Sequence, residues 1–506
     1  MPRLSTLLAL LTLVSAAAPS ALGQPTLVQQ FISPDPVSES RFGSGVAVDG
    51  DYIVVGEPGD LGAVGRAFVF VRTSGPSGWA FDAELIPASL EEGGEFDPTL
   101  GASVAFDWPL ALVGAPYESD VAINSGAAYL FRQNDEAEAW IDVAKFKAPT
   151  PALADQFGFA VAISGATAAI GAPTTDGDAE DAGAVYLFAR DAESGAWTLD
   201  QTLAAEDAEM GGRFGLTVDL AGDVLVVGAS NGPGAVYVFE RDGDAPWTQV
   251  QKLVPDDIEA GDAFGFDVAT DGETIFAGAP LSDPEGQGSA YAFERTGPAD
   301  APWQVAQRLV SLAPQGNAQF GAAVGVDGDR AVIGAPLDGT GVSSGAAYSF
   351  DRANGVWTPG ARLSVATDDA NAVFGLTLDL QSDLALIGSP GADGIAEANA
   401  GAAYAFAFAS TAAEAGAAPN ALTLAAPFPN PARGAATVAY ALSAPADISL
   451  AVYDVLGREV AVLDRGARAA GSHAVRWAAP GAPPGLYLLR LSDGERTATR
   501  KLVVVR

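Results

Sequence analysis

Apolar and polar positions alternate in short runs along most of the chain, and Gly, Pro, Asn and Asp separate the runs. Alternation with a period of two predicts β-strands with one buried face, and the separating residues predict turns. The same succession of runs returns every 50 to 58 residues. Because a period of this length is typical of propellers and solenoids, the pattern predicts an all-β repeat architecture.

Each copy of the repeat marks its four predicted strands. A Phe-Gly pair precedes the first strand, a Gly-Ala-Pro-like triplet ends the second, an aromatic residue lies two positions before a Phe in the third, and a Trp begins the fourth. Pro ends a strand because it cannot donate to the ladder, and small residues let neighbouring sheets approach. Seven copies predict a seven-bladed β-propeller over residues 24–408. The pairs are Phe42-Gly43, Leu100-Gly101, Phe157-Gly158, Phe214-Gly215, Phe264-Gly265, Phe320-Gly321 and Phe374-Gly375.

The seventh copy lacks the Trp that begins the fourth strand in the other six. Residues 25–32 at the predicted mature N-terminus align with residues 247–254, which are predicted to form the fourth strand of a copy in the middle of the chain. We therefore expect the N-terminal strand 25–32 to complete blade seven and to close the ring noncovalently.

The two ends of the chain differ from the repeats. Residues 1–23 combine Arg3, an apolar run and small residues before Gln24, which predicts an export signal peptide and a mature chain without a membrane span. Residues 409–426 are Ala-rich, as in a linker. Residues 427–506 alternate again between Pro and Gly turns, which predicts a small Ig-like β-sandwich.

Charge and composition exclude several functions. The chain has 63 Asp and Glu against 26 Lys and Arg, a net charge of −37, so it would repel nucleic acid. It has no Cys, which excludes disulfides and thiolate chemistry. Its one histidine, His473, lies in the tail, so the propeller has neither a Ser-His-Asp site nor a polyhistidine zinc site.

The succession of Phe-Gly, Gly-Ala-Pro and Gly-Ala-Tyr over residues 25–408 resembles the FG-GAP repeat family, found in bacterial surface proteins and in the head of integrin alpha chains. In the integrin-like version, the hairpin before Gly-Ala-Pro carries a calcium loop with the spacing D-x-D-x-D-G-x-x-D. The hairpins here depart from that spacing, as in Val48-Asp49-Gly50-Asp51. Asp-Gly turns need no metal, so the family's calcium role does not carry over to these positions.

The tail resembles the C-terminal sorting domain of the type IX (Por) secretion system over about 80 residues. The resemblance implies passage through the outer membrane by the type IX machinery, which would be a partner, and then release or attachment at the cell surface. The residues that carry it are Pro429, Asn430, Pro431, Tyr453, Asp454, Gly457, Gly485, Tyr487, Arg500 and Lys501.

The remaining chemistry is acidic. In a propeller, the loops between second and third strands and between blades share one face, here called the loop face, and the hairpins share the other, the hairpin face. The loop face would carry Glu91, Glu92, Glu95, Asp97, Glu118, Asp120, Asp176, Asp178, Glu180, Asp181, Glu206, Asp207, Glu209, Asp256, Asp257, Glu259, Asp262, Asp368 and Asp369.

Three interpretations of this face stay open. The carboxylates keep an exported protein soluble, or they hold calcium that bridges to anionic glycans or proteins, or two of them cleave a glycosidic bond. The calcium candidate is the set Asp176, Asp178, Glu180 and Asp181, and no other cofactor is indicated. We expect a secreted or surface-attached interaction and adhesion module rather than an enzyme, with a glycan or protein ligand. The alternative is a polysaccharide-degrading enzyme that uses a carboxylate pair.

Overall fold

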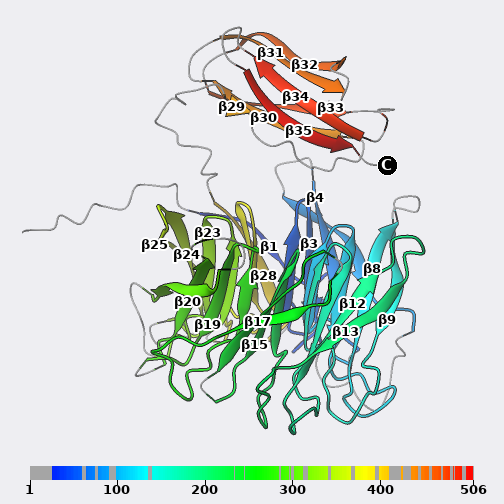
Figure 1. Ribbon diagram of the computed structural model, residues 1–506, viewed down its shortest axis with the longest axis vertical. Coiled ribbons are helices and arrows are strands. Elements are labelled where there is room, and N and C mark those ends of the chain that lie inside the picture. The colour runs from blue at the N-terminus through cyan, green and yellow to red at the C-terminus, as the bar shows by residue number, and fades with distance from the viewer. Residues whose placement is uncertain are drawn as a thin grey trace, which may run out of the picture. The chain divides into compact units, whose positions relative to one another are not determined.

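The computed structural model describes strands and turns, and no helix among the described residues is long and apolar enough to cross a membrane. The chain divides into two compact units, Met1–Ala409 and Ser410–Arg506. Figure 1 shows the ribbon of each. The predicted signal peptide and most of the predicted linker lie outside the described residues. These are 25–59, 64–73, 78–89, 98–134, 139–232, 234–243, 245–283, 286–295, 297, 301–311, 317–339, 344–365, 371–393, 398–408, 423–424, 435–442, 446–454, 458–468, 471–478, 483, 485–492 and 497–504.

Within the described residues, the first unit has seven antiparallel four-stranded sheets, here called blades one to seven. Each list runs from the innermost to the outermost strand. The blades are β2(Gly45–Asp49)-β3(Tyr52–Glu57)-β4(Arg66–Arg72)-β5(Trp79–Leu85), β6(Ser103–Asp107)-β7(Leu110–Ala115)-β8(Ala127–Asn134)-β9(Ala139–Phe146), β10(Ala160–Ser164)-β11(Thr167–Ala172)-β12(Ala184–Arg190)-β13(Trp197–Leu203), β14(Thr217–Ala221)-β15(Val224–Ala229)-β16(Ala235–Glu240)-β17(Thr248–Leu253), β18(Val268–Thr270)-β19(Thr274–Ala279)-β20(Ser289–Arg295)-β21(Trp303–Leu309), β22(Ala323–Asp327)-β23(Arg330–Ala335)-β24(Ala346–Ala353)-β25(Val356–Leu363) and β26(Thr377–Gln381)-β27(Leu384–Ser389)-β28(Ala402–Ala407)-β1(Thr26–Phe31).

The blades form a ring. The innermost strands contact one another in chain order, and β26 of blade seven contacts β2 of blade one. A parallel bridge between Phe42 and Gly401 joins the same two blades. The N-terminal strand β1 lies antiparallel to β28, where Thr26 is opposite Ala407 and Phe31 opposite Ala403. The predicted all-β propeller class is therefore confirmed.

The glycines of the repeat explain how the blades fit together. Within blade two, the amide of Gly101 donates to the carbonyl of Gly114 over 3.0 Å. The carbonyl oxygen of Gly101 in turn faces Gly56 of blade one, where an added Cβ would lie only 2.0 Å away. The Phe of each Phe-Gly pair is buried, Phe42 and Phe157 completely so. The Phe-Gly pair of one blade and the glycine of the Gly-Ala-Pro-like triplet of the preceding blade therefore meet at each blade junction, where the two backbones are in contact.

The second unit is a sandwich of two sheets, β29(Thr423–Leu424)-β30(Ala435–Leu442)-β33(Gly471–Ala478) and β32(Glu459–Arg468)-β31(Ala446–Asp454)-β34(Gly485–Ser492)-β35(Thr497–Val504). Both sheets contribute to one core, for example Val438 and Trp477 from the first and Leu450 and Leu489 from the second. Thr423 and Leu424 were expected in the linker. They pair instead with Ala441 and Tyr440 of β30, because a β-branched and an apolar residue suit an edge strand.

Candidate functional site

Glutamines join the outer edges of neighbouring blades. Gln201 of β13 donates its side-chain amide to the Trp247 carbonyl (2.8 Å) and accepts the Trp247 backbone N–H (2.9 Å). Gln251 and Gln307 make the same pair of bonds to Trp303 and Trp357. In β1, Gln29 does so with Trp79, at 2.9 and 2.7 Å. Gln201, Gln251 and Gln307 each stand four residues after a Trp of the repeat, a regularity that the strand pattern did not reveal.

A second set of interblade bonds lies on the hairpin face. Side chains at the ends of the innermost strands accept backbone N–H groups from the first turn of the next blade. Asp49 accepts from Trp108 (2.8 Å), Asp271 from Gly328 (3.0 Å), and Gln381 of blade seven from Gly50 of blade one (2.6 Å). The aspartates of these hairpins thus bind the backbone of the neighbouring blade.

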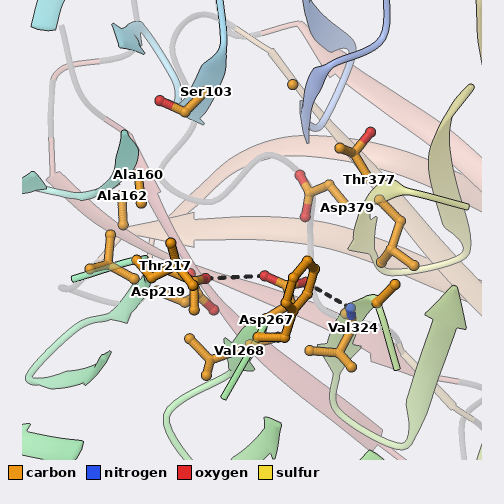
Figure 2. A pocket seen from close by; sticks show the side chains of 18 of the residues that line it. Ser103, Ala160, Ala162, Thr217, Asp219, Asp267, Val268, Val324, Thr377 and Asp379 are labelled. Carbon is orange, nitrogen blue, oxygen red and sulfur yellow. Dashed lines mark hydrogen bonds between the residues drawn. The ribbon is translucent and has the colours of Figure 1, made fainter. Parts of the chain in front are cut away.

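The innermost strands of all seven blades line a central cavity of about 1020 Å³. Three carboxylates that sequence analysis did not single out project into it: Asp219 from β14, Asp267 just before β18 and Asp379 from β26 (Figure 2). Figure 2 shows Asp267 between Thr217 and Val324. All three acids therefore line the cavity.

Each of these carboxylates binds the next blade. Asp219 accepts the backbone N–H of Thr270 at 2.6 Å. Asp267 accepts that of Val324 at 2.8 Å and the Thr217 hydroxyl at 3.1 Å. Asp379 accepts the backbone N–H of Val48 at 2.7 Å, across the junction of blades seven and one. The cavity acids therefore connect blades four to five, five to six, and seven to one.

Burial of the cavity carboxylates disfavours their charged forms. It raises the pKa of Asp219 to about 7 and the pKa values of Asp267 and Asp379 to about 6, against the opposing effect of the backbone hydrogen bonds. The charges of Asp379 and Asp267 raise the pKa of Asp219 further. At neutral pH Asp219 is therefore only partly ionised.

This titration predicts how stability depends on pH. Between about pH 4, where a free aspartate titrates, and pH 7, the folded chain keeps a proton on Asp219 that the unfolded chain has lost. Because the folded state binds more protons there, the contribution of Asp219 to stability is present at pH 4 and is lost as the pH rises through about 7. Each unit of pKa shift corresponds to about 1.4 kcal/mol. We expect Asp219→Asn to flatten the fall in unfolding free energy over this range.

Urea unfolding of the parent and the variant at pH 4.5, 6 and 7.5 measures this difference. Asp178→Asn, in an exposed loop, is the matched control and should leave the slope as it is in the parent. If the unfolding free energy falls equally with pH in the parent and in Asp219→Asn, then Asp219 titrates alike in the folded and the unfolded chain.

On the loop face, tyrosines lie directly opposite cations and share a carboxylate with them. Tyr129 of β8 faces Lys145 of β9, and Glu118 accepts the tyrosine hydroxyl (2.6 Å) and pairs with the ammonium. In blade four, Asp207 accepts from the Tyr237 hydroxyl (2.9 Å) and from Lys252 (2.6 Å). Asp338 holds Tyr348 and Arg362 in the same way. These cations are fixed in ion pairs.

The structure does not gather the four predicted calcium ligands. Asp176, Asp178, Glu180 and Asp181 lie on the exposed loop between β11 and β12, where Asp176 accepts the backbone N–H of Asp181 at 3.0 Å. Among all described residues, these four included, no group of three or more acidic or histidine side chains is placed to hold a metal ion. Calcium binding at this loop remains a prediction. Glu91, Glu92, Glu95, Asp97, Asp368 and Asp369 lie outside the described residues.

The predicted sorting residues are spread over the second unit. Tyr453 is part of β31, and Tyr487 of β34 is buried, with its hydroxyl donating to the Pro483 carbonyl at 2.7 Å. Arg500 and Lys501 lie exposed on β35. Gly485 begins β34 and Asp454 ends β31, whereas Pro429, Asn430, Pro431 and Gly457 lie outside the described residues.

These features define a β-propeller of repeated four-stranded sheets followed by a separate β-sandwich. Five segments match the FG-GAP repeat: residues 25–70, 140–188, 197–239, 247–293 and 303–350. Residues 426–505 match the secretion system C-terminal sorting domain. The chain is an FG-GAP repeat protein with a C-terminal sorting domain, and that domain directs it to secretion and the cell surface.

The matched segments begin and end at equivalent strands of the blades. Each runs from the fourth strand of one blade to the third strand of the next, and the first begins next to β1, as the others begin next to a Trp-led strand. Residues 79–131 and 357–406 do not match. The first of these has Leu100 in place of Phe, and the second has Ser389 in place of Ala.

Similar solved structures share little sequence with the chain. The Saccharomyces cerevisiae Sqt1 structure has 9% identity and a TM-score of 0.42, over 77% of this chain and 100% of that chain. The Porphyromonas gingivalis PorZ, a surface component of the type-IX secretion system, has 14% and 0.36, over 91% and 65%. The β-propeller domain of the Pyrococcus furiosus Trilobed protease has 10% and 0.36, over 68% and 87%. No curated protein matches the chain.

Proposed function

We propose that the propeller is a noncatalytic interaction and adhesion module, displayed outside the cell, whose loop face binds a positively charged protein surface. The observation that carries this proposal is the way charge is distributed on that face. Its cations are held by carboxylates, as Lys145 is by Glu118 and Asp120, while Asp176, Asp178 and Glu180 lie exposed. The face thus presents negative charge to a partner.

Two tyrosines and a lysine of the propeller are poorly suited to act as bases. Burial raises the pKa of Tyr129, and hydrogen bonds to Glu118 raise the pKa of Lys145 despite its burial. Burial raises the pKa of Tyr291 to about 12. Groups that stay protonated at neutral pH cannot abstract a proton from a substrate, which favours a binding role over a lyase.

The test compares charge removal on the two faces. A loop-face variant combines Asp176→Asn, Asp178→Asn and Glu180→Gln. A matched hairpin-face variant combines Glu193→Gln, Asp242→Asn and Glu273→Gln, which are also exposed and remove the same charge. Binding of the mature chain to a polylysine-coated sensor should fall about tenfold more in the loop-face variant, and it should weaken as salt rises. Equal loss in both variants would contradict a face-specific module.

Two further conditions separate the alternatives. If calcium bridges the loop face to its partner, EDTA abolishes binding and the loop-face variant loses its calcium-dependent melting shift, about 2.7 kcal/mol at 100 times Kd. The direct-contact proposal expects binding to persist in EDTA. Release of reducing sugar from neutral or anionic polysaccharides by the purified chain would instead support the enzyme alternative.

A further inference from the structure

We propose that the hairpin face of blades one and two carries a binding site for a neutral glycan. The site consists of four aromatic side chains, Tyr52, Phe106, Trp108 and Trp140, here called the aromatic platform. It uses the face opposite the acidic loops, so this inference goes beyond the proposed loop-face function and does not rest on it.

The four rings form one contiguous cluster. Tyr52 and Trp108 are stacked, with ring centres 4.1 Å apart and planes at 22°. Trp108 meets Trp140 edge to face at 6.3 Å, and Phe106 lies 6.1 Å from Trp140. All four side chains are partly exposed. The propeller thus presents flat apolar surfaces to solvent at the junction of blades one and two.

Trp108 is a departure from the repeat. It occupies the turn between the first and second strands of blade two, where the other blades have Gly50, Gly165, Gly222, Gly272, Gly328 and Ser382. Its backbone N–H makes the usual interblade bond, to Asp49, which needs no side chain. Six other blades form this turn without an aromatic residue. The indole of Trp108 is therefore not required by the fold.

The covering of Trp140 is a second departure. Four of the five equivalent tryptophans are at most 4% exposed, and an arginine lies over each of these four rings, 4.1 to 5.2 Å from its centre. These pairs are Trp79 with Arg72, Trp247 with Arg241, Trp303 with Arg295, and Trp357 with Arg352. The fifth, Trp197, is partly exposed, but an arginine, Arg190, still lies opposite it in the strand register. In blade two, the residue opposite Trp140 is Gln133. Both departures therefore occur at the same junction and increase the aromatic surface there.

The chemistry of the platform fits a sugar. One face of a pyranose ring is a layer of C–H groups that stacks on an aromatic ring, while its hydroxyls point outward to polar partners. Asp82, which accepts the Trp140 indole N–H at 3.0 Å, lies exposed beside the rings and can also accept from a sugar hydroxyl. Because this carboxylate adjoins the site on a chain of net charge −37, a neutral glycan is favoured over an anionic one.

The experiment measures binding of the mature full chain to laminarin, mannan and xylan, with alginate as the anionic comparison, by calorimetry and tryptophan fluorescence. The first variant combines Trp108→Gly with Pro109→Asp, which installs the Asp-Gly-Asp turn of blade one. A second variant, Gln133→Arg, introduces at Trp140 the arginine that covers four of the other tryptophans. We expect at least one neutral polysaccharide to bind and each variant to weaken its binding about tenfold at an unchanged melting temperature.

Two controls locate the effect. Phe266→Ala removes a 42% exposed aromatic ring that lines the central cavity, and it should leave glycan binding unchanged. The loop-face charge variant should also leave it unchanged, which separates this site from the polylysine assay. The inference is overturned if none of the three neutral polysaccharides binds, if alginate alone binds, or if both folded platform variants bind like the parent.

Discussion

Replacing Gly278 by alanine should lower the unfolding free energy by about 3 kcal/mol or more. An added Cβ would lie 1.8 Å from the carbonyl oxygen of Gly321 in the next blade. Neither backbone can shift easily, because the Gly278 amide donates to the backbone carbonyl of Asp267 (3.0 Å) and the Gly321 amide to that of Gly334 (2.9 Å). The methyl group must therefore push blades five and six apart and loosen the core between them.

Gly177→Ala is the matched control for this substitution. Gly177 is also a glycine outside the left-handed region, but a Cβ there would meet no atom within 4 Å. We expect its change in unfolding free energy to stay within about 0.5 kcal/mol. Urea unfolding followed by tryptophan fluorescence measures both variants. If Gly278→Ala unfolds at the same urea concentration as Gly177→Ala, the close contact is not a constraint on packing.

The marks in the sequence predicted the strand order because each reflects a local requirement of a single blade. Gly-Ala-Pro ends a strand and the Trp begins one, so these residues can be placed without knowing their partners. The close approach that makes the glycines necessary was expected only in general terms. Which carbonyl each glycine faces depends on the next copy, as Gly388 of blade seven facing Gly43 of blade one shows.

The interblade bonds were not predicted because they join residues far apart in the chain. Asp219 and its donor Thr270 are separated by 51 residues, and Asp379 and Val48 by 331. An aspartate on an inner strand looks like any polar position in an alternating pattern. The glutamines could have been found, since Gln201, Gln251 and Gln307 each follow a Trp by four residues.

The candidate sites also depend on contacts between residues that are far apart in the chain. Acidic loop residues can be assigned to one face from topology alone, but their pairing with Lys145 or Lys252 requires the register of the third and fourth strands. Trp108 replaces the turn glycine of most other blades, and this difference alone does not indicate a site. Only the propeller fold brings Trp108 of blade two against Tyr52 of blade one, and this contact identifies it as part of the aromatic platform.

Deleting residues 25–31 from the mature chain should lower the melting temperature by about 10 °C, which corresponds to a loss on the order of 5 kcal/mol. The deletion removes Phe31, which is 2% exposed and packs 4.9 Å from Phe70 and 6.1 Å from Trp79 of blade one. It also removes the two Gln29 bonds to Trp79 and leaves β28 as an open edge. Blade seven would then lose its outer strand and the contacts that this strand makes with blade one.

Side-chain controls distinguish the strand from its exposed residues. Leu27 and Val28 are 50% and 43% exposed, so alanine at either position should change stability by about 0.5 kcal/mol or less. Phe31→Ala should account for more than half of the deletion effect, because it empties a buried site while the backbone ladder stays. A synthetic peptide of residues 25–32, added to the truncated chain, should restore part of the lost melting temperature, since it can pair with β28 as β1 does. If the truncated chain melts with the parent and ignores the peptide, the ring does not depend on its N-terminal strand, and the interblade hydrogen bonds alone hold blades seven and one together.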